Sequence, residues 1–391
     1  MTRVLIYLFP AMIDVVFGTI FYVCPLRLAE GGASAVEVGG ILTAWAISYM
    51  IFNQIVGLLV NSRNAPWMLI GSSVCIAIIS GLFVIVPGVT WQYLFAVLIG
   101  IAGAFFFGPF QAFMKAVESG RPFGLARSTG MYTFAWSFGL ACGPFFSGFI
   151  WREFGWQWCY AVTALMGLAT AVGVFFLKHH AHSSRYEPSP KSSSGSVRNK
   201  ATDYSKMPDY AWLGWIASGI GCVAVAMLRG VFPKCGIEFD VSKFDQGMIM
   251  AVLCFSQSIT GLFLCRSRFW MYKPVSVGLF GACGVLSLIV FGLSTSPGLY
   301  YVAAILFGIY SGGFFFYFVF HSLVHPNRSS RYVAINESVV GGAGIAGPML
   351  GGVLADALQV NAPFYFAAVV VLAAVAFQVI VHGLKRATRP A

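Results

Sequence analysis

The stretch RSTGMYTFAWSFGLACGPFFSG, residues 127–148, decides the fold class, because it is apolar and aromatic yet holds four glycines and one proline. In water an interior Gly would weaken a helix by about 1 kcal/mol and a Pro by about 3 kcal/mol. In lipid the backbone has no other partner for its hydrogen bonds and stays helical. We therefore predict a membrane-spanning helix, bent at Pro144, that approaches a neighbour closely through a face of small residues. This face consists of Gly139, Gly143, Ser147 and Gly148.

The composition of the whole chain agrees with a membrane environment. Of 391 residues, 58% are hydrophobic and only 9% are charged, against about 25% charged in ordinary soluble domains. The mean hydropathy is +0.80. The net charge of +11 is spread over loops rather than gathered on one polar face, so we expect no nucleic-acid partner. The sequence predicts an all-α polytopic membrane protein whose main partner is the lipid bilayer.

Apolar runs of about 20 residues, the length that crosses a bilayer, occur twelve times. The predicted spans are 3–25, 36–60, 66–87, 90–114, 124–150, 155–177, 209–231, 245–265, 272–294, 297–321, 333–355 and 361–383. A polar segment at 179–208 interrupts them and reads as a linker between two six-helix bundles, residues 1–178 and 209–391. The first run is long, contains an acid and lacks a cleavage site, so we interpret it as a span rather than a signal peptide.

The distribution of basic residues predicts the orientation of the chain. If the N-terminus is inside, 19 of the 24 Lys and Arg residues fall on the inner side. The five on the outer side are Arg27, Arg152, Arg229, Lys234 and Lys243. Positive charge is enriched in cytoplasmic loops. We therefore expect a multi-pass protein of the cell (inner) membrane with both termini and the linker in the cytoplasm.

The two halves of the chain repeat each other at an offset of 204–208 residues. The matched pairs keep their order along the chain, which favours two pseudo-symmetric bundles of parallel topology, the plan of many secondary transporters. The pairs are Pro25 and Pro233, Glu37 and Asp245, Gly57 and Gly261, Arg127 and Arg331, Gly143-Pro144 and Gly347-Pro348, and Gly148 and Gly352.

With these residues the chain resembles the major facilitator superfamily. The exporters of that family carry G-x8-G-x3-G-P-x2-G-G in their fifth helix, and Gly130, Gly139, Gly143, Pro144 and Gly148 fit this pattern, with Ser147 in place of one glycine. The resemblance implies alternating access, helix-packing and gating roles for these residues and for Gly347, Pro348 and Gly352. It also implies a central cavity lined by helices one, four, seven and ten.

The loop between helices two and three resembles the family motif only in part. In GLLVNSRNAPW, residues 57–67, Gly57 and Arg63 fit, but Asn61 stands where the motif has an acid. The resemblance implies a cytoplasmic gate built from Gly57, Asn61, Arg63, Arg127 and Arg331. Because the motif is incomplete, a transporter-like membrane sensor or a non-transporting partner subunit stays as the alternative to a transporter.

Asp14 is a candidate for proton coupling or for binding the substrate. It lies near the middle of the first predicted span, where an ionisable group costs about 2.5–3.5 kcal/mol on insertion scales and is often functional. The resemblance places this helix at the central cavity. A carboxyl group shielded from water holds a proton more readily, which suits proton coupling. A structural acid that pairs with a neighbouring helix is the other interpretation.

Three further residues are candidates. Glu337, a second candidate for proton coupling or substrate binding, lies about one turn into the eleventh helix, where either a gating or coupling role or the favourable field of a helix start explains an acid. Gln111 and Tyr310 lie on helices that the resemblance places at the cavity. Glu37 and Asp245 head the second and eighth helices, and we interpret them as helix-start acids.

The sequence favours no enzyme. The G-x-G-x-x-G at 342–347 lies inside a predicted span, where close helix packing explains it better than nucleotide binding. A phosphate-binding G-x4-G-K-[ST] loop does not occur, and we expect no cofactor and no metal. The sequence therefore predicts a monomeric secondary active transporter of a small solute, coupled to protons, with export slightly favoured, as in an antiporter.

Overall fold

The computed structural model describes residues 5–61, 63–86, 88–118, 124–178, 210–266, 270, 273–323 and 329–387. Among these residues it contains twelve long helices and no strand. The helices are α2 (Leu8–Glu30), α3 (Ala35–Leu59), α4 (Ala65–Ile85), α5 (Val89–Glu118), α6 (Gly124–Phe154), α7 (Trp156–Leu177), α9 (Ala211–Glu238), α10 (Lys243–Arg266), α11 (Pro274–Leu293), α12 (Pro297–Leu323), α13 (Ser329–Ala357) and α14 (Ala362–Ala387).

All twelve helices are long and apolar enough to cross a membrane, so the predicted fold class is confirmed. Two predicted ends are wrong. Helix α2 runs to Glu30 rather than residue 25, and α9 runs to Glu238 rather than residue 231. Both contain a proline at or near the predicted end, Pro25 in α2 and Pro233 in α9. Prolines are tolerated inside membrane-spanning helices because neighbouring groups satisfy the freed backbone atoms.

The first six and the last six helices pack in the same pattern. In the first half α2 packs on α6, α3 on α5 and α4 on α7. In the second half α9 packs on α13, α10 on α12 and α11 on α14, which are the corresponding pairs. The packing therefore repeats the internal similarity of the sequence. The predicted linker, 179–208, lies outside the described residues.

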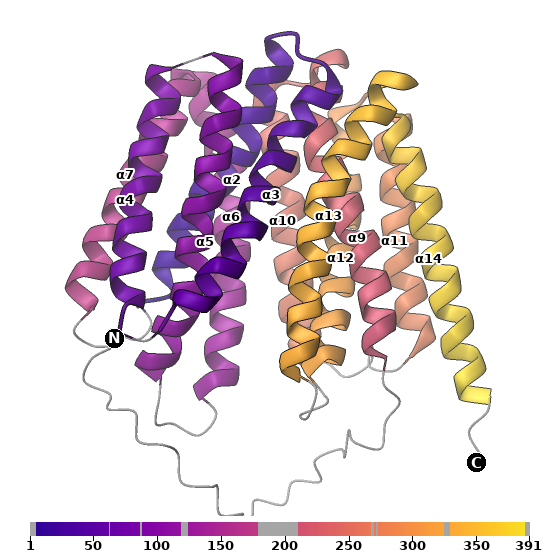
Figure 1. The fold of residues 1–391 in the computed structure, drawn as a ribbon. Helices are drawn as coiled ribbons and strands as arrows, with labels where there is room; N and C mark the ends of the chain where they lie inside the picture. The colour runs from indigo at the N-terminus through magenta and orange to yellow at the C-terminus, as the bar shows by residue number, and fades with distance from the viewer. Residues whose placement is uncertain are drawn as a thin grey trace, which may run out of the picture.

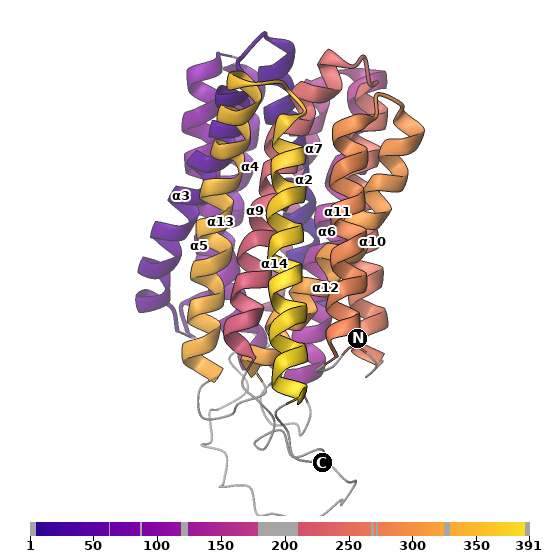
Figure 2. The ribbon, with the colours of Figure 1, turned by 90° about the vertical axis from the view of Figure 1, so that its right-hand side faces the viewer.

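The two halves meet through reciprocal contacts, α6 against α10 and α3 against α13. Figure 1 shows the halves side by side, and Figure 2, seen from the second half, places α14 in front of α9. We call the end at residues 31–34 and 239–242 the loop end, and the opposite end, where α7 ends and α9 begins, the linker end. The ribbons lie close together at the loop end and diverge toward the linker end (Figure 1).

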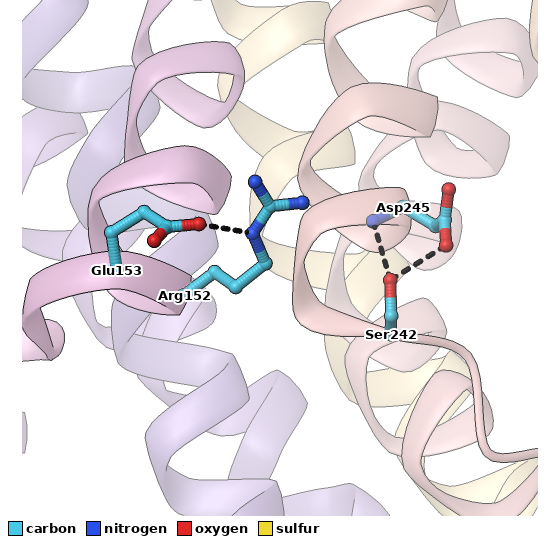
Figure 3. Close-up of polar contacts among 4 residues, drawn as sticks. All are labelled: Arg152, Glu153, Ser242 and Asp245. Atoms are coloured by element: carbon cyan, nitrogen blue, oxygen red, sulfur yellow. Dashed lines mark hydrogen bonds and ion pairs between the residues drawn. The ribbon is translucent and has the colours of Figure 1, made fainter.

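Matching caps begin α3 and α10 at the loop end. The backbone nitrogen of Glu37 donates to Ser34 Oγ over 3.2 Å, and the carboxylate of Glu37 accepts from the nitrogen of Ser34 over 2.8 Å. In α10 the nitrogen of Asp245 donates to Ser242 Oγ, which in turn donates to the Asp245 carboxylate over 2.6 Å (Figure 3). Such caps satisfy backbone donors that the first helical turn leaves unpaired. The two acids therefore stabilise helix starts.

Candidate functional site

The glycines of α6 and α13 first serve contacts inside each half. Gly143 faces α2, where an added Cβ would lie 2.5 Å from the backbone nitrogen of Thr19. Gly139 meets the same helix one turn earlier. In the second half Gly347 faces α9, with an added Cβ 2.6 Å from the carbonyl oxygen of Val223. Backbone therefore lies against backbone at these contacts, and a side chain has no room.

Other glycines of the same faces lie between the halves. A Cβ on Gly148 would lie 3.2 Å from the carbonyl oxygen of Phe244 in α10, and one on Gly352 would lie 2.6 Å from that of Ala35 in α3. The carbonyl oxygen of Pro144 and the backbone of Pro348 approach glycines of the opposite half in the same way. Some glycines of α6 and α13 therefore pack against helices of their own half, and others pack against helices of the opposite half. Gly130 lies outside the residues whose packing is described.

A carboxylate joins the halves on one side of the loop end. Asp356, at the end of α13, accepts hydrogen bonds from the backbone nitrogens of Ala35 and Val36, over 2.8 and 2.9 Å. These nitrogens belong to the first turn of α3, in the other half. The positive end of a helix stabilises a carboxylate, and the carboxylate satisfies donors that α3 cannot pair itself.

Lysines join the halves on the other side of the loop end. Lys243 Nζ of α10 lies 2.5 Å from Glu30 Oε1 of α2, and the Tyr22 hydroxyl donates to the carbonyl oxygen of Lys243. Lys234 Nζ of α9 donates to the carbonyl oxygen of Ala33 over 3.0 Å. Together with the Asp356 contact, these interactions hold the two halves closed at the loop end.

Arg152 also reaches across this end. Its Nε donates to Glu153 Oε1 over 2.7 Å, and its guanidinium carbon lies 4.7 Å from the centre of the Phe244 ring. Figure 3 shows this side chain extending from α6 toward α10. The pair is half exposed, so its contribution to stability is below about 1 kcal/mol.

A small cavity of about 30 Å³ lies between the halves, among four helices and nearer to their loop end. It has room for one or two water-sized groups. Two helices of the first half, α2 and α6, and two of the second, α9 and α10, form its wall. The lining residues are Gly18, Phe21, Tyr22, Leu140, Pro144, Arg229, Pro233, Met250 and Cys254.

Arg229 is the one charged residue in this wall, and sequence analysis missed it. It was assigned to the outer surface because α9 was predicted to end at residue 231. The helix continues to Glu238, so Arg229 lies about 13 Å along the axis before the helix ends. It is half-buried, and its Nη2 donates to Cys254 Sγ over 3.3 Å. The repeat pairs Pro233 with Pro25 but does not by itself show that either helix continues past its proline.

Asp14 is buried against α6. The residue is 6% exposed, and a Cβ added to Gly139 would lie 2.9 Å from the Asp14 Cβ. One carboxylate oxygen, Oδ2, is buried and has no hydrogen-bond partner among the described residues. Asp14 lies one helical turn before Gly18, a residue of the cavity wall, on the side toward the linker end. It therefore borders the cavity and does not line it.

The two polar candidates for the cavity lie elsewhere. Gln111 is exposed on α5 and is not part of the wall. Tyr310 is buried and lines a different small cavity, inside the second half, between α9, α11, α12 and α14. Its ring closes over Gly284 of α11, where a Cβ would lie 2.6 Å from the ring. The structure therefore does not bring Gln111 and Tyr310 together at the contact between halves.

The predicted gate loop forms a local turn. Asn61 Oδ1 accepts from the backbone nitrogens of Arg63 and Asn64, both over 3.0 Å. Thus Asn61, where the motif has an acid, shapes the start of α4. Gly57 has open space beside it, and Arg63 is exposed without an ion pair to any described residue. The side chains of Arg127, Arg331 and Glu337 lie outside the described part of the chain.

Comparison with known proteins gives the same family as the sequence motifs. No curated protein matches the sequence. Two solved structures of a bacterial homolog to the human lysosomal transporter Spinster share the fold. The inward-facing, unoccupied one has a TM-score of 0.72 at 14% identity, covering 100% of this chain and 98% of that chain. The inward-facing, occupied one has a TM-score of 0.63 at 16% identity, covering 98% and 94%.

The family model of the Major Facilitator Superfamily matches residues 4–324, most of the sequence. The match spans all of the first half and reaches the end of α12 in the second. Together with the twelve spanning helices and the fold of the Spinster homolog, it shows that the chain belongs to the Major Facilitator Superfamily, a family of transporters and not of enzymes.

Proposed function

We propose that the chain exports a small solute by alternating access and takes up protons in exchange. The loop end is held closed by contacts between the halves, and the cavity lies between the halves on the linker side of these contacts. Secondary transporters bind their cargo inside the membrane, between two repeated halves. The two bundles, 1–178 and 209–391, rock against each other, and solute enters from the linker end.

Asp14 is the proton site in this proposal. The observation that supports it is the buried carboxylate oxygen, which has no hydrogen-bond partner in the described part of the chain and lies next to α6, one of the helices that join the halves. A structural acid would have a cationic or hydrogen-bonding partner on the facing helix. An acid that gains and loses a proton in each transport cycle needs surroundings that do not hold it in the charged form, as a fixed cationic partner would.

The basic residues support the proposed orientation of the chain, with both termini in the cytoplasm. Moving Arg229 from the outer side to the membrane interior leaves four outer residues against 19 inner ones, so the argument for cytoplasmic termini becomes stronger. With this orientation the loop end faces outward and the linker end faces the cytoplasm. The protein would work in the inner (cell) membrane.

The test combines gradient-driven transport with exchange. A thermal-shift screen in detergent identifies a stabilising solute, which is then followed in proteoliposomes with and without a pH gradient. For one proton per neutral solute, a gradient of one pH unit concentrates the solute about tenfold. We expect Asp14→Asn to abolish this accumulation but to retain solute exchange at equal pH. Glu153→Gln removes an exposed acid and serves as the matched control.

Each outcome is decisive for the proton site. An Asp14→Asn protein that still concentrates solute against its gradient shows that Asp14 does not couple transport to protons. Solute binding by the wild-type protein without any flux would instead favour a sensor.

A further inference from the structure

Arg229 holds a charge inside the membrane that the protein itself does not neutralise. Its partner, the Cys254 thiol, is a weak acceptor and offers one contact to a guanidinium that has five N–H donors. No described carboxylate forms an ion pair with it. A guanidinium stays protonated in proteins, so its charge cannot be removed by losing a proton.

Two acids of the facing helix α2, Asp14 and Glu30, are distant from Arg229 or engaged elsewhere. At the offset of 208 that pairs Pro25 with Pro233, Asp14 corresponds to residue 222, seven positions before Arg229. Asp14 thus lies about 10 Å closer to the linker end along the parallel helices. Glu30 binds Lys243, at the loop end. Neither acid is therefore placed to neutralise Arg229 while the loop end is closed.

The rest of the cavity wall is mainly apolar. Phe21 and Met250 line it together with Arg229. The ring of Phe21 packs edge-on against that of Trp45, with the ring centroids 4.6 Å apart. The cavity admits one or two water-sized groups, so two oxygens of a carboxylate or of a phosphate can reach the guanidinium. The body of a solute would extend from it toward the linker end, because contacts such as that of Gly148 with Phe244 close the loop end.

We propose that Arg229 binds the anionic head, a carboxylate or a phosphate, of an amphipathic solute whose apolar part packs on the Phe21 side of the cavity. This inference rests on the proposed transport function and names the class of its cargo. A planar guanidinium suits both anions, because it can donate two parallel hydrogen bonds. The unneutralised charge is then explained by the cargo.

Binding to matched probes tests the charge preference. Phenylbutyrate, phenylbutanol and phenylbutylamine share a ring and chain but carry an anionic, neutral or cationic end. Their affinities are measured by titration calorimetry on the whole protein in phosphatidylcholine nanodiscs. We expect the wild-type protein to prefer phenylbutyrate and Arg229→Gln to bind it about 10- to 150-fold more weakly, with phenylbutanol binding unchanged. Arg152→Gln, which also removes one arginine, should retain the preference.

A second variant keeps the test valid if Arg229→Gln does not fold. Cys254→Asp places a carboxylate at the contact that Arg229 already makes, so it should neutralise the site internally and abolish the preference for phenylbutyrate. Repeating the titration in nanodiscs that contain phosphatidylglycerol separates two sources of the anion. Competition that depends on Arg229 identifies a lipid head group, and no competition identifies a soluble organic anion.

Several results would overturn this inference. They are a wild-type protein that binds no probe, one that prefers the amine or the alcohol, and an Arg229→Gln or Cys254→Asp protein that binds phenylbutyrate as the wild type does. Flux measurements keep the two proposals apart. Proton-driven transport of the neutral or cationic probe would support the transport proposal and refute the anion site. Arg229-dependent binding without flux would do the reverse.

Discussion

Replacing Gly352 by alanine should open the loop end. An added Cβ would lie 2.6 Å from both the carbonyl oxygen of Ala35 and the Cα of Val36, and both atoms belong to the backbone of the opposite half. Carbon atoms pack at about 3.5–4.0 Å, so α13 and α3 must separate by about 0.9 Å or more. The same movement would lengthen the hydrogen bonds of Asp356, now 2.8 and 2.9 Å, beyond bonding range.

The expected cost falls on the closed state alone. Overpacking costs about 1–3 kcal/mol, and the clash disappears when the halves separate at this end. Gly352→Ala should therefore raise the population of open loop ends about 5- to 150-fold. The amide hydrogens of Ala35 and Val36 report this directly, because they are bonded to Asp356. Hydrogen–deuterium exchange measured by mass spectrometry should accelerate at α3 by that factor.

Two other glycines provide matched controls. Gly143→Ala produces a clash of similar size inside the first half, so it should lower the melting temperature without accelerating exchange at the start of α3. Gly342→Ala has open space and should change neither measurement. If Gly352→Ala lowers the melting temperature and leaves exchange at Ala35 and Val36 unchanged, the contact does not control opening and the reasoning is wrong.

The polar contacts at the loop end should contribute different amounts to the stability of the closed state. Asp356→Ala leaves two first-turn donors of α3 unpaired and should cost about 1–2 kcal/mol, seen as faster exchange at the same amides; wild-type exchange rates there would contradict this. Glu30→Gln removes a half-exposed ion pair with Lys243 and should cost less than about 1 kcal/mol, so a larger acceleration of exchange would show that this pair carries the closure.

The number and order of the helices could be predicted from the sequence because bilayer thickness fixes the length of an apolar span. The two helix-start acids, Glu37 and Asp245, were also predictable, since capping depends on local sequence. The helix ends at Pro25 and Pro233 were not, because a proline ends a helix in water more often than in lipid. The error at Pro233 moved Arg229 to the surface and concealed it.

Which neighbour each small residue meets depends on helix rotation, and periodicity does not determine that angle. The sequence therefore predicted one face of small residues against one neighbouring helix, whereas Gly143 packs inside one half and Gly148 between the two. For the same reason Tyr310, on a helix assigned to the central cavity, turns into the second half. Asp14 could be found because a charge in an apolar run is conspicuous without any knowledge of rotation.

The helix caps at Ser34 and Ser242 occupy matching positions of the two halves, as expected if the chain arose by duplication of one half. The scaffold kept the cap in both halves, but Asp14 corresponds to a cysteine in the second half and Arg229 to Phe21 in the first. Each copy thus kept the architecture and acquired one charge of its own, of opposite sign and at a different depth. The two halves of one molecule thereby differ from each other in charge, which two identical copies of the ancestral half would not.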